Sequence, residues 1–423
     1  MSPTQTSATR SKLAIDGGPK AKPGPYGVGR RFGQEELSQL AEALEQNTLF
    51  YTKGKKTAEL CRRFAARYGV RHCVPCSSGT AALHIALAAC GVKPGDEVIT
   101  SPLTDMGTCS AILFCGAIPV FADVDPRNYT LDPASVEAHV GPRTTAIIPV
   151  HLTGAACDMD ALSAIARRHD LWLVEDCAQA YECEYRGRRC GTIGDVGCFS
   201  LNDFKHISAG DAGLVITDDP ELARGAALFS DKCYDRTPGV GRDPAFLAPN
   251  YRMCELHAAV ALAQLEKLDS IVERRRRYGE GLIAGLGGIP GILPQQFVAG
   301  GRSSHWFWLL RVDERVLGPR AGFVAALKAE GLIADEGCHQ GPPVYMYGVF
   351  VNRRGFGGTE FPFSLAPQVR YGPGLCPQAE AVIADCVCGP VSEFFTDEDL
   401  VQTIAGFRKV AEAFAARRKG GGA

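Results

Sequence analysis

The stretch Leu171-Trp172-Leu173-Val174-Glu175-Asp176 is a short apolar run that ends in two acidic residues. Similar apolar runs recur along the chain, at 73–76, 97–101, 118–122, 145–150, 196–200 and 213–217. Helical stretches separate several of these runs, at 81–90, 106–115, 133–139 and 159–169. Strands that are apolar on both faces and are separated by crossover helices form a mostly parallel sheet flanked by helices. The sequence therefore predicts an α/β fold, whose ligands lie beyond the carboxyl ends of the strands.

A second, smaller domain is expected after a long helix predicted for residues 253–286. The Gly- and Pro-rich stretch 287–294 marks a boundary, because such residues interrupt regular structure. A strand at 305–312 and helices at 320–330 and 396–417 then indicate an α+β domain. We expect three regions: an N-terminal arm at 1–25, a large domain at 26–270 and a small C-terminal domain at 271–423.

Composition excludes several classes of partner. The 423 residues carry 47 acidic and 45 basic side chains, a formal charge of −2, which gives no electrostatic footprint for nucleic acid or an anionic membrane. The basic cluster 274–277 lies beside acidic residues and is interpreted as a solvated helix face. The polar segment 1–22 lacks an apolar core of signal-peptide length, and no window is long enough to cross a bilayer. We therefore expect a cytoplasmic protein.

The seventeen cysteines are scattered along the chain rather than concentrated in a short disulfide scaffold. Cys73 and Cys76 have the spacing of a metal or redox pair. A zinc site needs a second pair, and Cys386 and Cys388 are too close in sequence to supply a standard one. Buried packing is the preferred interpretation over a metal or redox function, and we expect no metal site.

A candidate anion site lies at 77–80, where Ser78, Gly79 and Thr80 precede a predicted helix without internal Gly or Pro. Backbone N–H groups at a helix start, together with the helix dipole, bind a phosphate group. Ser200 could supply a further hydroxyl. A serine that only caps the helix explains the same residues.

Asp176 ends a predicted strand, where the sheet directs side chains into the ligand crevice. A carboxylate at that place can keep a pyridine nitrogen protonated, so that the ring accepts electrons. An N-cap for a following helix is the alternative. Gln179 can hydrogen-bond a ring hydroxyl, and Ala178 is small enough for a ring to lie on it.

Lys205 follows the strand at 196–200 and is the candidate catalytic residue. Its amine can form a Schiff base with a cofactor carbonyl and then move protons, provided that desolvation lowers its pKa. Most loop lysines are only solvated, but a lysine, a strand-end carboxylate and an anion-binding helix start are the parts that hold pyridoxal 5'-phosphate.

Four motifs carry a resemblance to a known family. They are Ser-Ser-Gly-Thr-Ala-Ala-Leu at 77–83, Glu-Asp-Cys-Ala-Gln-Ala at 175–180, Gly-Asp-Val-Gly-Cys-Phe-Ser at 194–200, and Asn-Tyr-Arg-Met at 250–253 with Glu-Leu at 255–256. In this order and spacing the chain resembles the DegT–StrS family of sugar aminotransferases, from about residue 50 to the terminal helix.

The resemblance implies the fold type I architecture of pyridoxal phosphate enzymes and a homodimer with active sites at the subunit interface. It implies that Lys205 is the Schiff-base lysine, and that Asn250 reaches the phosphate from the partner subunit. Asp176 and Gln179 then hold the ring, and Gly79, Thr80 and Ser200 hold the phosphate. Family members transfer an amino group from glutamate or glutamine to a keto sugar nucleotide or a keto cyclitol, in secondary metabolism or cell-surface sugar synthesis.

The chain departs from the family pattern at two places. Asp105 stands where the family usually has an aromatic ring that stacks on the cofactor, and Tyr181-Glu182-Cys183 stands where members commonly have a His-Gly-Ala-like stretch. A dehydratase branch carries histidine at the lysine position, so Lys205 favours transamination. A dehydratase or eliminase of the same family remains an alternative, and a non-catalytic regulatory protein that binds the cofactor is a more distant one.

Tyr181, Glu182 and two histidines complete the candidate substrate residues. His206 follows Lys205 and could assist proton transfer, although packing against the loop is the commoner role for such a residue. His305 begins an aromatic strand and could face the cleft, while its neighbours form core.

Overall fold

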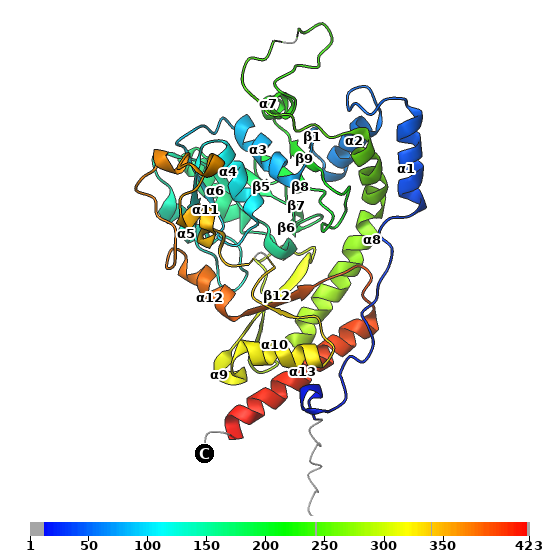
Figure 1. The fold of residues 1–423 in the computed structure, drawn as a ribbon, viewed down its shortest axis with the longest axis vertical. Helices are drawn as coiled ribbons and strands as arrows, with labels where there is room; N and C mark the ends of the chain where they lie inside the picture. The colour runs from blue at the N-terminus through cyan, green and yellow to red at the C-terminus, as the bar shows by residue number, and fades with distance from the viewer. Residues whose placement is uncertain (1–11, 242, 340, 421–423) are drawn as a thin grey trace, which may run out of the picture.

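The computed structural model describes residues 12–241, 243–339 and 341–420, so residues 1–11 of the expected N-terminal arm lie outside the described residues. A large α/β part and a smaller sheet-containing part are joined by one long helix, α8 (Glu255–Leu286) (Figure 1).

The large part is built on a seven-stranded sheet with the order β1-β9-β8-β5-β4-β2-β3. Its strands are β1 (His72–Cys76), β2 (Glu97–Thr100), β3 (Ile118–Phe121), β4 (Thr144–Ile148), β5 (Trp172–Asp176), β8 (Val196–Ser200) and β9 (Gly213–Thr217). Only β9 runs antiparallel to its neighbours β1 and β8, and the other pairs are parallel. The mostly parallel sheet predicted from the sequence is confirmed.

Both outer strands of this sheet contain a proline, Pro75 in β1 and Pro119 in β3. Proline has no N–H group to donate to a ladder and is therefore found in edge strands rather than central ones. The hydroxyl of Tyr371 donates to the carbonyl oxygen of Pro119 at 2.8 Å, which covers part of the β3 edge.

Six helices accompany the strands of this sheet: α2 (Lys56–Tyr68), α3 (Gly79–Ala89), α4 (Met106–Phe114), α5 (Pro133–His139), α6 (Met159–His169) and α7 (Pro220–Ser230). A serine or aspartate side chain accepts a first-turn amide at the start of each helix from α3 to α7, as N-caps do. Adjacent residues of β2 face opposite layers, since Val98 packs with α3, α4 and α7 while Ile99 packs with α2, α6 and α8.

The smaller part contains a four-stranded antiparallel sheet in the order β10-β12-β14-β13. Its strands are β10 (Ile292–Pro294), β12 (Phe307–Val312), β13 (Asp335–Glu336) and β14 (Cys386–Pro390). The helices α9 (Glu314–Leu317), α10 (Arg320–Ala329) and α13 (Asp397–Gly420) pack on it around Leu282, Leu310, Phe323 and Phe407. A further small sheet consists of β6 (Glu184–Tyr185), β7 (Arg188–Arg189) and β11 (Gly301–Arg302).

The segment 344–379 lies within the range expected for the small domain but packs against the large part, beside α4 (Figure 1). It contains α11 (Gly348–Val351) and the start of α12 (Pro377–Asp385). The amide of Val344 donates to the carbonyl of Pro102 at 2.9 Å, and the amides of Gln378 and Ala379 donate to Asp123. The chain therefore leaves the small part and returns to it through β14.

The N-terminal segment 12–33 runs beside α8 from the small part to α1 (Gln34–Glu45) (Figure 1). The buried Glu330 accepts the amides of Ala14 and Ala21 at 2.8 Å, and Lys22 pairs with Asp399. This segment therefore has contacts with both parts of the molecule. None of the helices in the described ranges is both long and apolar enough to cross a membrane.

Candidate active site

A pocket of about 240 Å³ opens at the carboxyl ends of β2, β5 and β8, beside the start of α3. The residues that line it are Ser78, Gly79, Thr80, Leu83, Thr104, Asp105, Gly107, Thr108, Asp176, Ala178, Gln179, Ser200, Asn202, Lys205 and Asp211. The structure thus brings together the lysine, the strand-end carboxylate and the helix start that were predicted from the sequence as parts of one site. The helix start and Lys205 are more than 120 residues apart in the chain, with Asp176 between them, and the parallel sheet gathers them.

The start of α3 is shaped to bind an anion. Ser78 caps the helix, because its Oγ accepts the amide of Ala81 at 3.1 Å, as the capping alternative proposed. In the described part of the chain, the amides of Gly79 and Thr80 have no hydrogen-bond acceptor, so they are available to a ligand. The positive end of the α3 helix dipole lies at the same helix start and also favours a bound anion.

Glycine is required at the start of α3 by close packing. A Cβ at Gly79 would lie 2.6 Å from Cβ of Ser200, which no real structure tolerates without a shift. The bare backbone therefore lets α3 approach β8, and Ser200 reaches the helix start. Gly107 plays a similar part, since a Cβ there would lie 2.6 Å from Oγ1 of Thr80.

Asp176 is buried at the end of β5 and is held by two donors. Thr108 Oγ1 donates to its Oδ2 at 2.8 Å, and the amide of Ala178 donates to its Oδ1 at 3.0 Å. Burial raises the pKa of Asp176, while these hydrogen bonds and the charge of Lys205 oppose the rise. Turns rather than a helix follow Asp176, so the N-cap alternative does not describe it.

Lys205 projects from the loop after β8 toward the same pocket. Its Nζ lies 4.1 Å from the centroid of the Trp306 ring, in the range of a cation–π contact. Burial lowers the pKa of Lys205, and the charges of Asp176 and Asp105 oppose this effect. An amine with a lowered pKa is more often neutral, which is the form that attacks a carbonyl.

Asp105 lines the pocket and also caps α4. Its Oδ1 accepts the amide of Gly107 at 2.8 Å, while the side chain stays exposed. An N-cap prefers Asp, Asn, Ser or Thr, and this preference gives a local reason for an acidic residue where a ring was expected.

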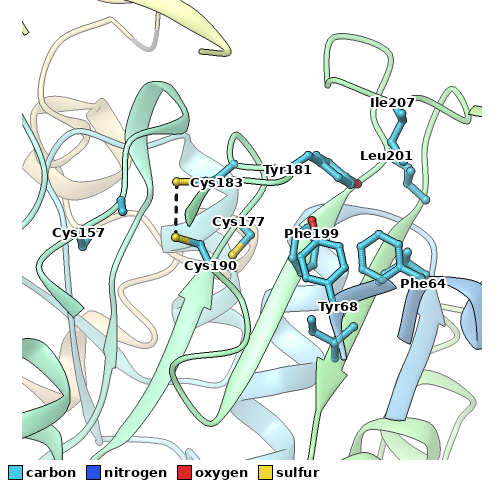
Figure 2. Packing of buried hydrophobic residues seen from close by; sticks show 14 of the residues in the cluster. Phe64, Tyr68, Cys157, Cys177, Tyr181, Cys183, Cys190, Phe199, Leu201 and Ile207 are labelled. Carbon is cyan, nitrogen blue, oxygen red and sulfur yellow. Dashed lines mark hydrogen bonds between the residues drawn. The ribbon is translucent and has the colours of Figure 1, made fainter. Parts of the chain in front are cut away.

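Tyr181 and Glu182 lie outside the pocket. Tyr181 is buried among Phe64, Tyr68 and Phe199 (Figure 2), and its hydroxyl donates to the carbonyl of Ser200 at 2.9 Å. The carboxylate of Glu182 pairs with Arg67 and Arg189, each at 2.8 Å. The structure therefore gives both residues packing partners rather than a place in the pocket.

The two candidate histidines are also buried outside the pocket lining. His206 Nε2 donates to the carbonyl of Ser304 at 3.0 Å, and burial holds the pKa of His206 well below its usual value. His305 lies against α8 at Gly279, where a Cβ would come within 2.3 Å of its ring. Burial lowers the pKa of His305 to about 4. Both rings are therefore neutral side chains that pack the loop and the helix.

Asn250 is exposed and does not line the pocket of its own chain. It forms an isolated bridge with Asp231, in the connection between α7 and α8 that projects from the molecule (Figure 1).

Several lining residues had no role assigned to them from the sequence. Thr108 binds Asp176, and Thr104 lies 2.7 Å from Thr108, so the two hydroxyls form a relay to the carboxylate. Asn202 Nδ2 donates to Asp211 Oδ1 at 3.0 Å across the pocket mouth. Thr104 precedes the cap of α4 and Thr108 lies in its first turn, so both belong to the connection that follows β2.

Cys73 and Cys76 lie in β1, where Cys76 is buried and Cys73 is half-buried. Burial raises the pKa of Cys76 to about 12, so its thiol stays protonated at neutral pH. Neither belongs to a metal-ligand cluster of the described residues.

One cluster in the described residues, His151, Glu175 and Cys177, holds its potential metal ligands within 4.8 Å of one another. Glu175 accepts His151 Nε2 at 2.9 Å and three backbone amides of the loop 191–194 at 2.6–2.8 Å. Burial raises the pKa of Glu175, but these donors outweigh it and hold the pKa below its usual value. Since protein donors engage both carboxylate oxygens, the cluster is a structural network beneath Asp176.

The residues of the pocket fit pyridoxal phosphate. The free amides of Gly79 and Thr80 suit its phosphate, the Asp176 carboxylate suits a protonated ring nitrogen, and the Lys205 amine suits its aldehyde.

The sequence model of the DegT/DnrJ/EryC1/StrS aminotransferase family matches residues 31–408. The chain belongs to this family. As a member of the DegT/DnrJ/EryC1/StrS family it is an aminotransferase with the fold of the pyridoxal phosphate aminotransferases, as the resemblance implied.

Other proteins of this family are similar over most of their length. The spore coat polysaccharide biosynthesis protein SpsC of Bacillus subtilis is 38% identical over 339 residues, which cover 78% of this chain and 86% of that protein. An L-glutamine:2-deoxy-scyllo-inosose aminotransferase of Streptoalloteichus tenebrarius is 41% identical over 308 residues, or 70% of this chain and 72% of that one. The crystal structure of S. venezuelae DesV with a ketimine intermediate has a TM-score of 0.79 at 30% identity and covers 90% of this chain and 95% of that chain.

Proposed function

We propose that this aminotransferase binds pyridoxal 5'-phosphate through Lys205 and acts in the cytoplasm. In the proposed reaction it moves an amino group from glutamate or glutamine to a keto sugar, carried on a nucleotide, or to a keto cyclitol. The observation that carries the proposal is that the Lys205 amine, the Asp176 carboxylate and the free amides at the start of α3 line one pocket.

The chain's own residues would hold the cofactor by its charged groups. The amides of Gly79 and Thr80 and the hydroxyl of Ser200 would bind the phosphate, and the α3 dipole would favour its negative charge. Asp176 would accept a hydrogen bond from the ring nitrogen, because its two protein donors leave it further lone pairs.

Gln179, Ala178 and Asp105 would define the position of the ring. Gln179 Oε1 accepts the amide of Thr153 at 2.9 Å, which leaves the amide group of its side chain free to donate. Ala178 offers a small surface at the pocket wall, and Asp105 also borders the pocket, from the start of α4.

Lys205 would act as the base and acid of the reaction. When bound, the cofactor supplies a carbonyl that takes up the amino group and a ring that accepts electrons from the reacting carbon. The Lys205 amine would then take a proton from the carbon atom that bears the amino group of the donor, and return one to the former keto carbon of the acceptor. Its lowered pKa supports this role at neutral pH.

We further propose a homodimer in which Asn250 of one subunit reaches the phosphate site of the other. The exposure of Asn250 outside its own pocket, in the projecting connection after α7, supports this arrangement. Tyr181, Glu182, His206 and His305, which were candidate substrate residues, have packing partners, so we propose a supporting role for them.

Relatives support the classes of donor and acceptor. One relative is named as a glutamine-dependent aminotransferase of an inosose, a keto cyclitol, and another as a protein of polysaccharide biosynthesis. Both names are compatible with secondary-metabolite or cell-surface sugar synthesis as the setting of the present protein. The dehydratase alternative has no observation in its favour, because the lysine is kept and Asp105 has a capping role.

An absorbance experiment tests the proposal. The purified protein is loaded with pyridoxal phosphate, and its visible band is followed on addition of glutamine, glutamate or, as a control, D-alanine. We expect glutamine or glutamate to bleach the band, and a keto cyclitol or a keto sugar nucleotide to restore it. Lys205→Ala should lack the band, while Lys93→Ala, at an exposed lysine, should keep it. A band that neither glutamine nor glutamate alters would contradict the proposed donors.

A further inference from the structure

The loop that carries Lys205 is held by side chains from outside the loop. The guanidinium of Arg31 donates to the carbonyl oxygen of Lys205 at 2.6 Å through Nη2, and to that of Asp203 through Nη1. Arg31 belongs to the N-terminal segment, more than 170 residues away in sequence. The fork of a guanidinium spans two carbonyls at once, and a charged donor makes each of these bonds stronger than a neutral one.

Trp306 holds the carbonyl of Phe204, which lies between the carbonyls of Asp203 and Lys205 in the loop. Its indole Nε1 donates to the carbonyl oxygen of Phe204 at 2.7 Å, while its ring lies 4.1 Å from Nζ of Lys205. One side chain at the entry to β12 therefore contacts both the backbone and the reactive amine of the loop. The Phe204 side chain is 75% exposed, so burial of that side chain contributes little to holding the loop.

Arg31 and Trp306 are themselves connected through a buried pair. Arg275 of α8 donates to Glu393 at 2.9 Å and to the carbonyl of Trp306 at 3.1 Å. Glu393 lies 3.7 Å from Nε of Arg31. Ion pairs of this kind keep a fixed geometry because they are screened from water. The lysine loop thus rests on a network that joins the N-terminal segment, α8 and the small part.

We propose that Arg31 and Trp306 are positioning residues for Lys205: they fix three consecutive carbonyl groups of its loop and tie the reactive amine to the N-terminal segment and the small part. This inference rests on the proposed function of Lys205 as the cofactor-binding lysine. Neither residue needs to touch the substrate, since Arg31 acts through the backbone of the loop and Trp306 acts through that backbone and the Lys205 amine. A shift of the small part relative to the large part would move the amine, so the network would couple domain position to the chemistry of the lysine.

The test measures the reactivity of the Lys205 amine and the exchange of the loop amides in the cofactor-free protein, so its readouts do not depend on enzymatic activity. Reductive methylation at a series of pH values, read by peptide mass spectrometry, gives the apparent pKa of the Lys205 amine. Hydrogen exchange of the amides at 203–207 gives the stability of the loop. The variants are Arg31→Ala, Arg31→Lys and Trp306→Phe, and the matched control is Arg30→Ala, at the exposed neighbouring arginine.

We expect Arg31→Ala to speed exchange of the loop amides by about tenfold or more, because two charged hydrogen bonds are lost. The apparent pKa of Lys205 should rise by about half a unit or more as the amine leaves its buried site. Arg31→Lys should not restore the wild-type values, since an ammonium lacks the planar fork. Trp306→Phe, which keeps a ring but loses the donor, should speed exchange as well, and Arg30→Ala should match wild type.

If Arg31→Ala and Trp306→Phe both gave the same exchange and methylation curves as the wild-type protein, the inference would be overturned. The two variants are independent, so the second remains informative if the first does not fold. Trapping of pyridoxal phosphate on wild-type Lys205 with borohydride separates this result from a failure of the proposed function. If pyridoxal phosphate is trapped on wild-type Lys205 but the variants exchange and react as wild type does, only the positioning role is refuted. If no cofactor is trapped on wild-type Lys205, the proposed function of Lys205 is refuted as well.

Discussion

Thr108 Oγ1 donates a hydrogen bond to Asp176 Oδ2 across 2.8 Å and so links the first turn of α4 to the end of β5. The donor helps to keep a buried carboxylate charged in a place where burial favours the neutral acid. The position of Thr108 depends in turn on the cap of α4 by Asp105. The carboxylate proposed to face the cofactor ring is therefore set from a neighbouring strand–helix connection.

Replacement of Thr108 should weaken cofactor binding. Thr108→Val keeps the shape of the side chain but removes the hydrogen bond, which is worth about 1–1.5 kcal/mol, so we expect the Kd for pyridoxal phosphate to rise by about tenfold. Titration followed by absorbance measures the effect. Ser110→Ala, on the same helix but outside the pocket lining, is the control. Equal affinities in the two variants would show that the bond does not support Asp176.

Gly79 should resist replacement even by alanine. Gly79→Ala places a Cβ 2.6 Å from Cβ of Ser200, so α3 must move away from β8, and such overpacking costs about 1–3 kcal/mol of unfolding free energy. Gly225→Ala, in α7, meets its nearest atom at 3.4 Å, and there alanine should be neutral or stabilise the helix by up to about 1 kcal/mol. Urea unfolding of the cofactor-free protein compares the two. A stable Gly79→Ala protein would mean that α3 can shift without cost.

The Lys22–Asp399 pair should make stability depend on acidity. Burial raises the pKa of Asp399, but hydrogen bonds from Lys22, Thr396 and Gly27 outweigh it and lower the pKa from 3.8 to about 2. The folded state therefore binds fewer protons than the unfolded state between these values. The charge of Asp399 therefore contributes about 2 kcal/mol to the free energy of unfolding. This contribution is fully present above the pKa of Asp399 in the unfolded state and is lost as the pH falls through its pKa in the folded state.

Asp399→Asn tests this dependence. The variant should be less stable than wild type at neutral pH, and the difference should shrink as the pH falls toward 2, as thermal unfolding at several pH values would show. Asp397→Asn, in an exposed pair with Arg277, should change stability by less than about 0.5 kcal/mol. A difference that does not change with pH would mean that Asp399 acts by packing rather than by charge.

Subunit mixing tests the proposed role of Asn250. If Asn250 serves the partner's site, a mixture of Lys205→Ala and Asn250→Ala subunits should recover about a quarter of wild-type activity, since half of the dimers are hybrids with one intact site each. Each variant alone should be nearly inactive. Hybrids without activity would place Asn250 in the site of its own subunit or outside any site.

Much of the fold could be predicted because apolar runs and crossover helices are local patterns. The strand ends at Asp176 and Ser200 and the helix start at Ser78 followed from these patterns, and the parallel sheet places all three at one edge. The return of 344–379 to the large part had no such signal, because it depends on tertiary contacts such as that between Val344 and Pro102.

The site was harder to predict where partners are distant in sequence. Thr108 and Asp176 are 68 residues apart, and Trp306 reaches a loop 102 residues away. Tyr181 was a candidate substrate residue because it stands in a stretch that departs from the family pattern, but the turn there directs the Tyr181 side chain into the core. Asp105 was interpreted as a missing ring, while its role as a helix cap became visible only with the amide of Gly107 in place.

The prolines of the outer strands have a consequence for how the protein meets other copies of itself. An unprotected sheet edge invites another chain to add a strand, which leads to open-ended aggregates. Pro75 and Pro119 each remove one donor from the two ends of the seven-stranded sheet, and Tyr371 occupies an acceptor at one of them. Both edges of this sheet are therefore poor templates for strand addition by a second copy of the chain.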